Sequence, residues 1–280
     1  MIVSELIKLG SLHLKRENIK SYALDSEILL SKVLEKSREE ILVEFDKQID
    51  FEDEKKFKRL IKRRSAKEPI AYILKHKEFW SKKFQINNNI LIPRPETELL
   101  VEKLCNIYSG KNISILDIGT GSGCIIISLL SELQNSYGVG VDVSKKAIEV
   151  ASINAKKLVS NRRIKFLKKS FSNIFNSKFD LIVSNPPYIK RGDIKNLNED
   201  IKRFEPKIAL DGGNDGLDVI RKVIYKTSEI LKINGKLALE IGNEQYKKVS
   251  KILINNNLRI EHIITDYNKN IRCLISTLLK

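Results

Sequence analysis

The stretch Asp117-Ile118-Gly119-Thr120-Gly121-Ser122-Gly123 decides the fold, and it closes an apolar run that begins at Ser114. Such a run, ended by closely spaced glycines, predicts a buried strand over Ser114–Ile118 that turns into a helix over Cys124–Glu132. Glycines adopt positive φ and let a ligand approach the backbone. Amides at the start of the helix can face a polar group of that ligand. The loop is therefore a candidate ligand site, although a tight turn without a ligand uses the same glycines.

Strands and helices alternate over the C-terminal part of the chain, where Pro95 fits the first turn of a helix. The other strands are expected over Gly138–Val143, Ile164–Leu167, Phe179–Val183, Lys236–Ile241, Arg259–Thr265 and Arg272–Leu278, and the other helices over Lys145–Leu158 and Leu217–Leu231. This alternation predicts a mostly parallel sheet with helices on both faces. Only Asp266 to Ile271 separates the last two strands, which permits an antiparallel hairpin and excludes a helical crossover. The sequence predicts an α/β fold whose seven-stranded sheet has an antiparallel last strand.

Residues 1–75 have apolar side chains at helical spacing and predict a small α-helical domain. Asp25-Ser26-Glu27 and Ser37 are expected to precede helices as N-caps. Residues 76–94 form a connector in which a β-hairpin is expected, with Asn87-Asn88-Asn89 as a turn. Residues 95–280 then form the sheet domain.

Asp142 lies about nineteen residues after the glycine loop, at the end of the second expected strand. A carboxylate there can accept both hydroxyls of a ribose. A dinucleotide site would have glycine at position 124, where this chain has Cys124, and the loop contains no lysine for phosphate. The Gly-x-Gly-x-Gly spacing and the antiparallel end of the sheet favour S-adenosylmethionine as the cofactor.

The fourth expected strand leads directly into Asn185-Pro186-Pro187-Tyr188. Ligands of open α/β sheets bind at the carboxyl ends of the strands, so this tetrapeptide should face the cofactor. The Asn185 side-chain oxygen and the Pro186 carbonyl can each accept one hydrogen of a planar NH2 group. The prolines stiffen the loop, and Tyr188 can pack on a flat substrate group. The pattern predicts methyl transfer to an oriented neutral nitrogen without a general-base histidine, although a rigid turn remains the alternative.

The composition first suggests a nucleic-acid-binding protein, because the formal net charge is +16. However, Lys, Ile and Asn supply 100 of the 280 residues, a bias that an AT-rich coding sequence would produce. Residues 1–90 hold 20 basic and 15 acidic side chains, so they form no concentrated basic arm. Direct nucleic-acid binding is therefore not expected.

Other sequence features favour a cytoplasmic protein without a metal. The three cysteines, Cys105, Cys124 and Cys273, show no metal-ligand spacing and are expected to be reduced. No apolar run approaches the roughly 18 residues of a membrane span. The first residues lack the basic and apolar regions of a secretory signal.

Asn185–Tyr188 and the glycine loop together resemble class I (Rossmann-like) S-adenosylmethionine-dependent methyltransferases that act on amino or amide nitrogen. That group includes nucleic-acid and protein methyltransferases, so other segments decide the substrate. The sequence is similar to the release factor glutamine methyltransferases, the PrmC/HemK family, over Glu68–Ile73, Glu78–Trp80, Leu91–Glu98, Glu205-Pro206, Ala209-Leu210, Gly212-Gly213 and Asp215–Leu217.

The resemblance implies methyl transfer to the Gln side chain in the Gly-Gly-Gln motif of bacterial peptide chain release factors, which would be partners of the helical domain. It implies cofactor contacts from the strand end and loop, and from three residues after later strands: Asp117, Gly119, Thr120, Gly121, Ser122, Gly123, Asp142, Phe171 and Asn185. The catalytic residues would be Asn185, Pro186 and Tyr188, and Pro187 would complete the substrate pocket with them.

Two positions depart from the family pattern. Ser170 stands where an acidic residue often bonds the adenine, and a glycine usual near Lys75 is absent. Within the family, Arg94–Glu98 favours the release factor over a ribosomal protein as substrate. A methyltransferase for nucleic-acid amines and a non-catalytic nucleoside-binding module are the alternatives outside it.

Overall fold

The computed structural model describes residues 1–159, 162–175 and 177–279, and positions 160, 161, 176 and 280 lie outside this description. The chain divides into two compact units. The first contains Met1–His76 and Asn198–Phe204, and the second contains Lys77–Leu197 and Glu205–Lys280. Each unit has its own core, so each is described by itself.

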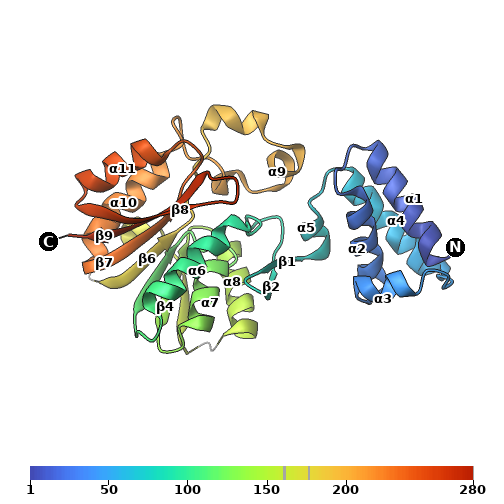
Figure 1. Ribbon diagram of the computed structural model, residues 1–280, viewed down its shortest axis with the longest axis horizontal. Helices are drawn as coiled ribbons and strands as arrows, with labels where there is room; N and C mark the ends of the chain where they lie inside the picture. The colour runs from blue at the N-terminus through green and yellow to red at the C-terminus, as the bar shows by residue number, and fades with distance from the viewer. Residues whose placement is uncertain (160–161, 176, 280) are drawn as a thin grey trace. The chain divides into compact units, whose positions relative to one another are not determined.

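The first unit is helical, as predicted (Figure 1). Its helices are α1 (Val3–Arg16), α2 (Tyr22–Leu34), α3 (Arg38–Val43), α4 (Phe51–Ser65), α5 (Ile70–Leu74) and the separate α9 (Glu199–Phe204). Leu6, Leu29 and Phe57 are fully buried and belong to one apolar cluster from α1, α2 and α4. Ser37 caps α3 as expected, since its side chain accepts a hydrogen bond from Glu40 N.

The N-cap expected at Asp25–Glu27 is wrong, because α2 already begins at Tyr22. Asp25 instead lies inside the helix and is buried, where its Oδ2 accepts a hydrogen bond from Arg64 Nε at 2.7 Å. Ser21 Oγ donates to the same oxygen at 2.8 Å. The acidic residue therefore joins α2 to α4 through a buried ion pair.

The second unit is built on the predicted seven-stranded sheet, with strand order β5-β4-β3-β6-β7-β9-β8. Its strands are β3 (Ser114–Ile118), β4 (Tyr137–Asp142), β5 (Ile164–Lys168), β6 (Phe179–Ser184), β7 (Leu231–Glu240), β8 (Leu258–Thr265) and β9 (Ile271–Leu278). The pairs from β5 to β7 are parallel, and β9 is antiparallel to both β7 and β8. The last strand therefore inserts between β7 and β8, and β8 forms the edge.

Helices cover both faces of this sheet (Figure 1). They are α6 (Glu96–Tyr108), α7 (Cys124–Glu132), α8 (Lys145–Leu158), α10 (Asp218–Ile230) and α11 (Tyr246–Asn255), with short 3-10 turns η1 (Phe171–Asn173), η2 (Arg191–Asn196) and η3 (Lys207–Ala209). Ile115 packs with α6, α7 and α8, whereas the next residue, Leu116, packs with α10 and α11. Successive side chains of a strand point to opposite faces, so a strand covered on both sides is apolar throughout.

A small hairpin precedes the sheet and consists of β1 (His76–Phe79) and β2 (Lys82–Gln85). Its turn is Trp80-Ser81, and both residues have a φ of 52°, as tight two-residue hairpin turns require. The turn expected at Asn87–Asn89 exists but follows the hairpin. Phe79 and Phe84 bury their rings in the cluster formed by α6 and α7.

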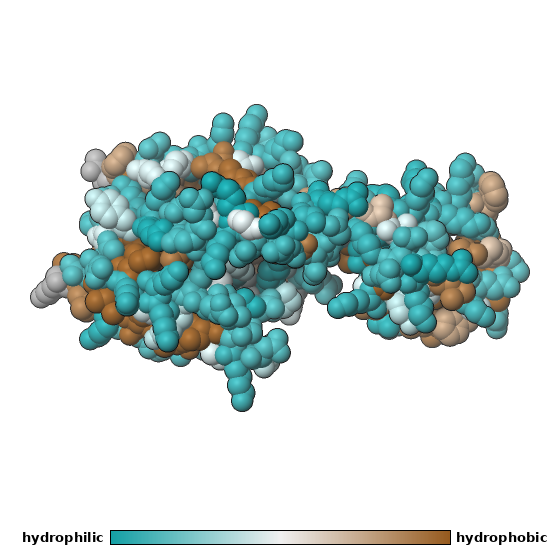
Figure 2. Space-filling view, turned by 90° about the horizontal axis from the view of Figure 1, so that it is seen from above, coloured by the Kyte–Doolittle hydropathy of each residue, from teal (hydrophilic) through white to brown (hydrophobic). Residues whose placement is uncertain are grey.

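The surface visible in Figure 2 is mostly hydrophilic, with separate apolar patches. Large apolar side chains that are strongly exposed include Val43, Phe51 and Tyr267. Over the residues that the structure describes, no helix has the length and apolar character needed to span a bilayer.

The buried pair between Asp25 and Arg64 predicts a large stability effect. Arg64→Met keeps the aliphatic stem but leaves the Asp25 carboxylate without its ionic partner, which should cost about 3–5 kcal/mol of unfolding free energy. The matched control is Lys56→Met, because Lys56 pairs with Asp53 on the surface and an exposed pair contributes about 0–1 kcal/mol. Chemical denaturation followed by circular dichroism measures both variants, and equal losses would contradict the assignment.

Candidate active site

A cavity of about 330 Å³ lies at the carboxyl ends of β3, β4 and β6, a size within the usual range of small-molecule sites. Its wall comes from segments far apart in the sequence. They include the glycine loop, the end of β4, η1 and the loop after β6. Among the predicted site residues, the cavity is lined by Gly119, Gly121, Asp142, Phe171, Asn185, Pro186 and Pro187.

The glycine loop presents open backbone to this cavity. Gly119 and Gly121 have φ values of 72° and 55°, in the left-handed region that disfavours other residues. A Cβ at Gly119 would meet nothing within 4 Å. Gly119 N and Thr120 N both donate to Val141 O, at 2.9 and 3.0 Å, so the loop is fastened to β4. Gly123 differs, because a Cβ there would lie 2.8 Å from Ile127 Cδ1.

Four of the predicted cofactor residues support the loop and do not line the cavity: Asp117, Thr120, Ser122 and Gly123. Asp117 is 1% exposed and accepts a hydrogen bond from Thr120 Oγ1 at 2.7 Å. Burial raises the pKa of Asp117 to about 7, because water no longer stabilises the carboxylate. Thr120 and Ser122 are also buried. These side chains set the shape of the loop from beneath.

Asp142 ends β4 and contributes a carboxylate to the cavity wall. Its Oδ2 accepts a hydrogen bond from Gly121 N at 3.1 Å, and its Oδ1 accepts one from Ser144 N at 2.9 Å. Burial raises the pKa of Asp142, while these backbone donors lower it in part. The carboxylate thus joins the glycine loop to the start of α8 and still borders the cavity.

Phe171 opens η1 after β5 and lines the cavity next to Ser170. The Ser170 hydroxyl accepts a hydrogen bond from Ser172 N at 3.3 Å, so it caps the short turn. The position that often carries an acidic residue in the family is therefore occupied by a small side chain with a local role.

Tyr188 is the one residue of the tetrapeptide that does not line the cavity. Its ring is half-buried against the cluster beneath α10 and α11. Its hydroxyl lies 3.4 Å from Glu240 Oε1, and burial raises the pKa of this phenol well above its usual value. The ring and hydroxyl therefore connect the tetrapeptide to the end of β7.

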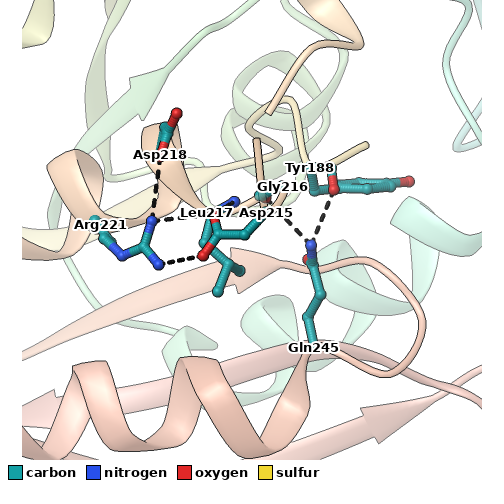
Figure 3. A network of polar contacts seen from close by, with 7 residues as sticks. All are labelled: Tyr188, Asp215, Gly216, Leu217, Asp218, Arg221 and Gln245. Carbon is teal, nitrogen blue, oxygen red and sulfur yellow. Dashed lines mark hydrogen bonds and ion pairs between the residues drawn. The ribbon is translucent and has the colours of Figure 1, made fainter. Parts of the chain in front are cut away.

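Gln245 holds the backbone of Tyr188 in place (Figure 3). Its Nε2 donates to Tyr188 O at 2.9 Å and to Gly216 O at 3.2 Å. Its Oε1 accepts from Gly242 N at 2.8 Å. In the same network, Arg221 is ion-paired with Asp215 and Asp218. The buried amide of Gln245 thus joins the tetrapeptide loop to the loops that contain Gly216 and Gly242.

The segment around Pro95 carries three polar side chains, Arg94, Thr97 and Glu98, and each makes a separate contact with a distant part of the chain. Arg94 Nη2 donates to Glu205 Oε1 at 2.6 Å. Thr97 Oγ1 donates to Glu240 Oε2 at 2.6 Å. Glu98 Oε1 accepts from Trp80 N at 3.1 Å. Pro95 is the N-cap of α6, so the segment both starts the helix and joins the hairpin, β7 and the Glu205 loop.

Sequence reasoning missed Glu240 and Gln245. Glu240 is the last residue of β7 and is 2% exposed. A carboxylate at the end of an apolar strand of an α/β sheet is the signal that could have identified it. Gln245 had no such signal, because its partners are backbone atoms of distant loops. Within the described ranges, no group of three or more His, Cys, Asp and Glu residues is placed to hold a metal ion.

Comparisons with known proteins identify both parts of the chain. A family described as PrmC N-terminal domain matches residues 5–74, and one described as Methyltransferase small domain matches residues 95–203. A release factor glutamine methyltransferase of Rhodospirillum rubrum is 36% identical over 99% of this chain and 85% of its own length. One of Buchnera aphidicola is 38% identical over 93% of this chain and 94% of its own length.

The chain belongs to the release factor glutamine methyltransferase family. The first curated relatives that it matches are named bifunctional methyltransferases, and the chain spans about half of their length. That of Rickettsia prowazekii is 35% identical over 97% of this chain and 56% of its own length. Among solved structures, a methyltransferase from Pyrococcus furiosus covers 70% of this chain and 89% of its own, with a TM-score of 0.53 at 18% identity. That likeness confirms the class I methyltransferase fold of this family member.

The packing around Tyr188 predicts that replacing Gly216 costs more stability than replacing a glycine in open space. Both Gly216→Ala and the control Gly110→Ala introduce a side chain at positive φ, at 78° and 71°, which costs about 1–2 kcal/mol. Only at Gly216 would the Cβ also crowd Tyr188 O at 2.6 Å and Gln245 Nε2 at 2.8 Å. Gly216→Ala should therefore lose about 1–3 kcal/mol more than Gly110→Ala in chemical denaturation. Equal losses would show that Tyr188 and Gln245 do not constrain this position.

Proposed function

We propose that this chain transfers a methyl group from S-adenosylmethionine to the side-chain amide nitrogen, N5, of the Gln in the Gly-Gly-Gln motif of bacterial peptide chain release factors. One observation carries the proposal. The glycine loop, Asp142 and Asn185-Pro186-Pro187 border a single cavity, although they follow three different strands. Amide methylation needs a cofactor site next to a substrate site, and in this family member the residues expected for both border the same cavity. The reaction would take place in the cytoplasm.

The residues present suit S-adenosylmethionine. Gly119 and Gly121 have no side chain and leave open space beside the loop, where the polar end of a ligand can lie. Asp142 offers carboxylate oxygens to ribose hydroxyls. Phe171 offers an aromatic face to adenine. We assign Asp117, Thr120, Ser122 and Gly123 to the support of this cofactor loop, because three of them are buried and Gly123 packs closely against Ile127.

The substrate amide is held by acceptors from this chain. When bound, S-adenosylmethionine supplies an electrophilic methyl group on a positively charged sulfur. Asn185 Oδ1 and Pro186 O would each accept one hydrogen of the substrate NH2 and so point its nitrogen toward the cofactor side of the cavity. Pro187 would complete the pocket wall, and Tyr188 would hold the tetrapeptide in place through its contact with Glu240. The new N–C bond forms as the S–C bond breaks, and the nitrogen then loses its proton to solvent.

Positioning supplies most of the catalysis in this proposal. An amide nitrogen is a poor nucleophile, because its lone pair is delocalised into the carbonyl group. Holding two reactants in line is worth several kcal/mol, up to about 7–11 kcal/mol in the best intramolecular cases. Acceptors aimed at a nitrogen that becomes positive stabilise the transition state further. The rigid Pro186-Pro187 pair and the buried bonds behind Tyr188 provide the required fixed geometry.

The helical unit, Met1–His76, is assigned to the release factor in this proposal. The match to the PrmC N-terminal domain covers residues 5–74 of it. Direct nucleic-acid binding has no part in the proposal, since residues 1–90 form no concentrated basic arm.

Incubation with the substrate tests the function directly. The purified chain and S-adenosylmethionine should add one methyl group to the Gly-Gly-Gln glutamine of an unmodified release factor, as seen by peptide mass spectrometry. A release factor with Glu in place of that Gln is the control and should gain nothing. Methylation of a ribosomal protein or of a nucleic-acid amine instead would replace the proposed substrate. No transfer by a chain that binds the cofactor would refute it.

The role of Asn185 predicts a separation of binding and catalysis. Asn185→Ala removes one oriented acceptor from the substrate nitrogen, a loss of about 1–3 kcal/mol in the transition state. The rate should therefore fall about tenfold or more, while calorimetry should show cofactor affinity close to that of the wild type. A variant with wild-type turnover would show that Asn185 does not hold the reacting amide.

A further inference from the structure

Two buried side chains, Thr97 and Glu240, lie behind Asn185 and form a hydrogen-bonded chain with it. Thr97, in the first turn of α6, donates a hydrogen bond to Glu240 Oε2 at 2.6 Å. The Asn185 Nδ2 atom lies 3.5 Å from the same Thr97 hydroxyl and donates to it. Thr97 and Glu240 are both 2% exposed. The site chemistry described so far uses neither of them.

We propose that Glu240 and Thr97 form a relay that fixes the orientation of the Asn185 side-chain amide. They are then positioning residues for methyl transfer. The inference rests on the proposed function and deepens it. It names what makes Asn185 an acceptor on the side where the substrate nitrogen binds.

The direction of each hydrogen bond follows from the groups themselves. An ionised carboxylate only accepts, so the single Thr97 hydroxyl proton must go to Glu240. The lone pairs of the Thr97 hydroxyl then face Asn185, and only the NH2 end of the amide can meet them favourably. Asn185 Oδ1 is thereby left for the cavity that Asn185 lines. The reversed amide would present its own NH2 to the substrate NH2, where two donors would meet.

A second donor holds the carboxylate in place. The Tyr188 hydroxyl lies 3.4 Å from Glu240 Oε1, the oxygen that Thr97 does not use. Glu240 therefore receives hydrogen bonds from two separate elements, α6 and the tetrapeptide loop. Hydrogen bonds to a charged group are stronger than those between neutral groups, so the 2.6 Å bond from Thr97 fixes the direction of its hydroxyl while Glu240 is ionised.

The protonation state of Glu240 should switch the relay. Burial raises the pKa of Glu240 to about 7, and hydrogen bonds from Thr97 and, directly, from Asn185 partly oppose this. The charged and titratable groups that act on Glu240 or feel its charge from the surrounding elements are Glu96 on α6, Arg272 and Cys273 on β9, Cys124 on α7 and Tyr188. A protonated Glu240 can donate to Thr97, whose own proton is then free to turn to Asn185 and favour the reversed amide.

The sign of the pH effect follows from this. The working form is ionised, so kcat at saturating S-adenosylmethionine is full above the pKa of Glu240 and falls as the pH drops through about 7. Asp117 has a pKa raised to a similar value beneath the cofactor loop. To distinguish the effect of Glu240 on kcat from that of Asp117, kcat is measured at saturating cofactor and compared with that of a variant of Thr97.

The kinetic test uses Thr97→Val in the full chain, a change that keeps the shape and removes the hydroxyl. We expect kcat at pH 8 to fall about tenfold, the equivalent of one hydrogen bond, with KM for the release factor little changed. The fall in kcat below pH 7 should become clearly smaller in this variant, because only the direct contact of Asn185 with Glu240 remains. Thr97→Ser should restore both the rate and the pH dependence.

The matched control is Thr227→Val. Thr227 on α10 is fully buried, and its hydroxyl has no hydrogen-bond partner among the described residues. The control should keep kcat and its pH profile. If Thr97→Val lowers the melting temperature but keeps the wild-type kcat and pH profile, then Thr97 is only structural and the relay is refuted.

A second readout needs no turnover. In protein labelled with ¹⁵N at asparagine, the side-chain NH2 signal of Asn185 is identified by its loss in Asn185→Ala. This signal should shift as the pH is taken through 7 in the wild type and shift much less in Thr97→Val, where only the direct contact of Asn185 with Glu240 is left. A signal that is constant in the wild type overturns the relay even if methylation is observed. A shifting signal supports the relay even if the release factor is not the substrate, so the two proposals fail separately.

Discussion

Parallel pairing of β3 with β4 on one side and β6 on the other is the constraint on which the rest of the site depends. In this register Ile118 lies beside Val141 and Ser184, so the three strands end at the same level. The residues that follow each end must then share one edge of the sheet. Segments that are about 20 and 65 residues apart in the chain therefore meet at this edge, because β3 pairs directly with both β4 and β6. The cavity is a consequence of the register.

Buried polar groups hold this edge in shape. Asp117 lies beneath the glycine loop, Glu240 and Gln245 lie behind the tetrapeptide, and each is bonded to a different neighbouring segment. A buried carboxylate is costly unless donors surround it, so each of these residues strongly favours one arrangement of the loops. In the proposed reaction, the same fixed donors and acceptors would provide a site that does not have to reorganise.

Much of this organisation could be predicted from local sequence. The glycine loop, Asp142 and Asn185-Pro186-Pro187 were all placed at strand ends by their position after apolar runs, and the structure brings them to one cavity. The expectation for Asp25 was wrong, because an acid before an apolar run resembles an N-cap, whereas here it is the partner of Arg64. The hairpin turn at Trp80-Ser81 was missed, since neither residue is one that usually adopts positive φ.

The sequence by itself determined the order of strands and helices, the helical first unit and the chemistry of the two loops, because these depend on spacing along the chain. Only the tertiary structure decided which buried polar residues support those loops. Thr97 meets Glu240 across 143 positions, and Arg94 meets Glu205 across 111. No local pattern specifies such pairs. They form because α6 packs beside the sheet and each buried polar group must find a partner where the fold has brought it.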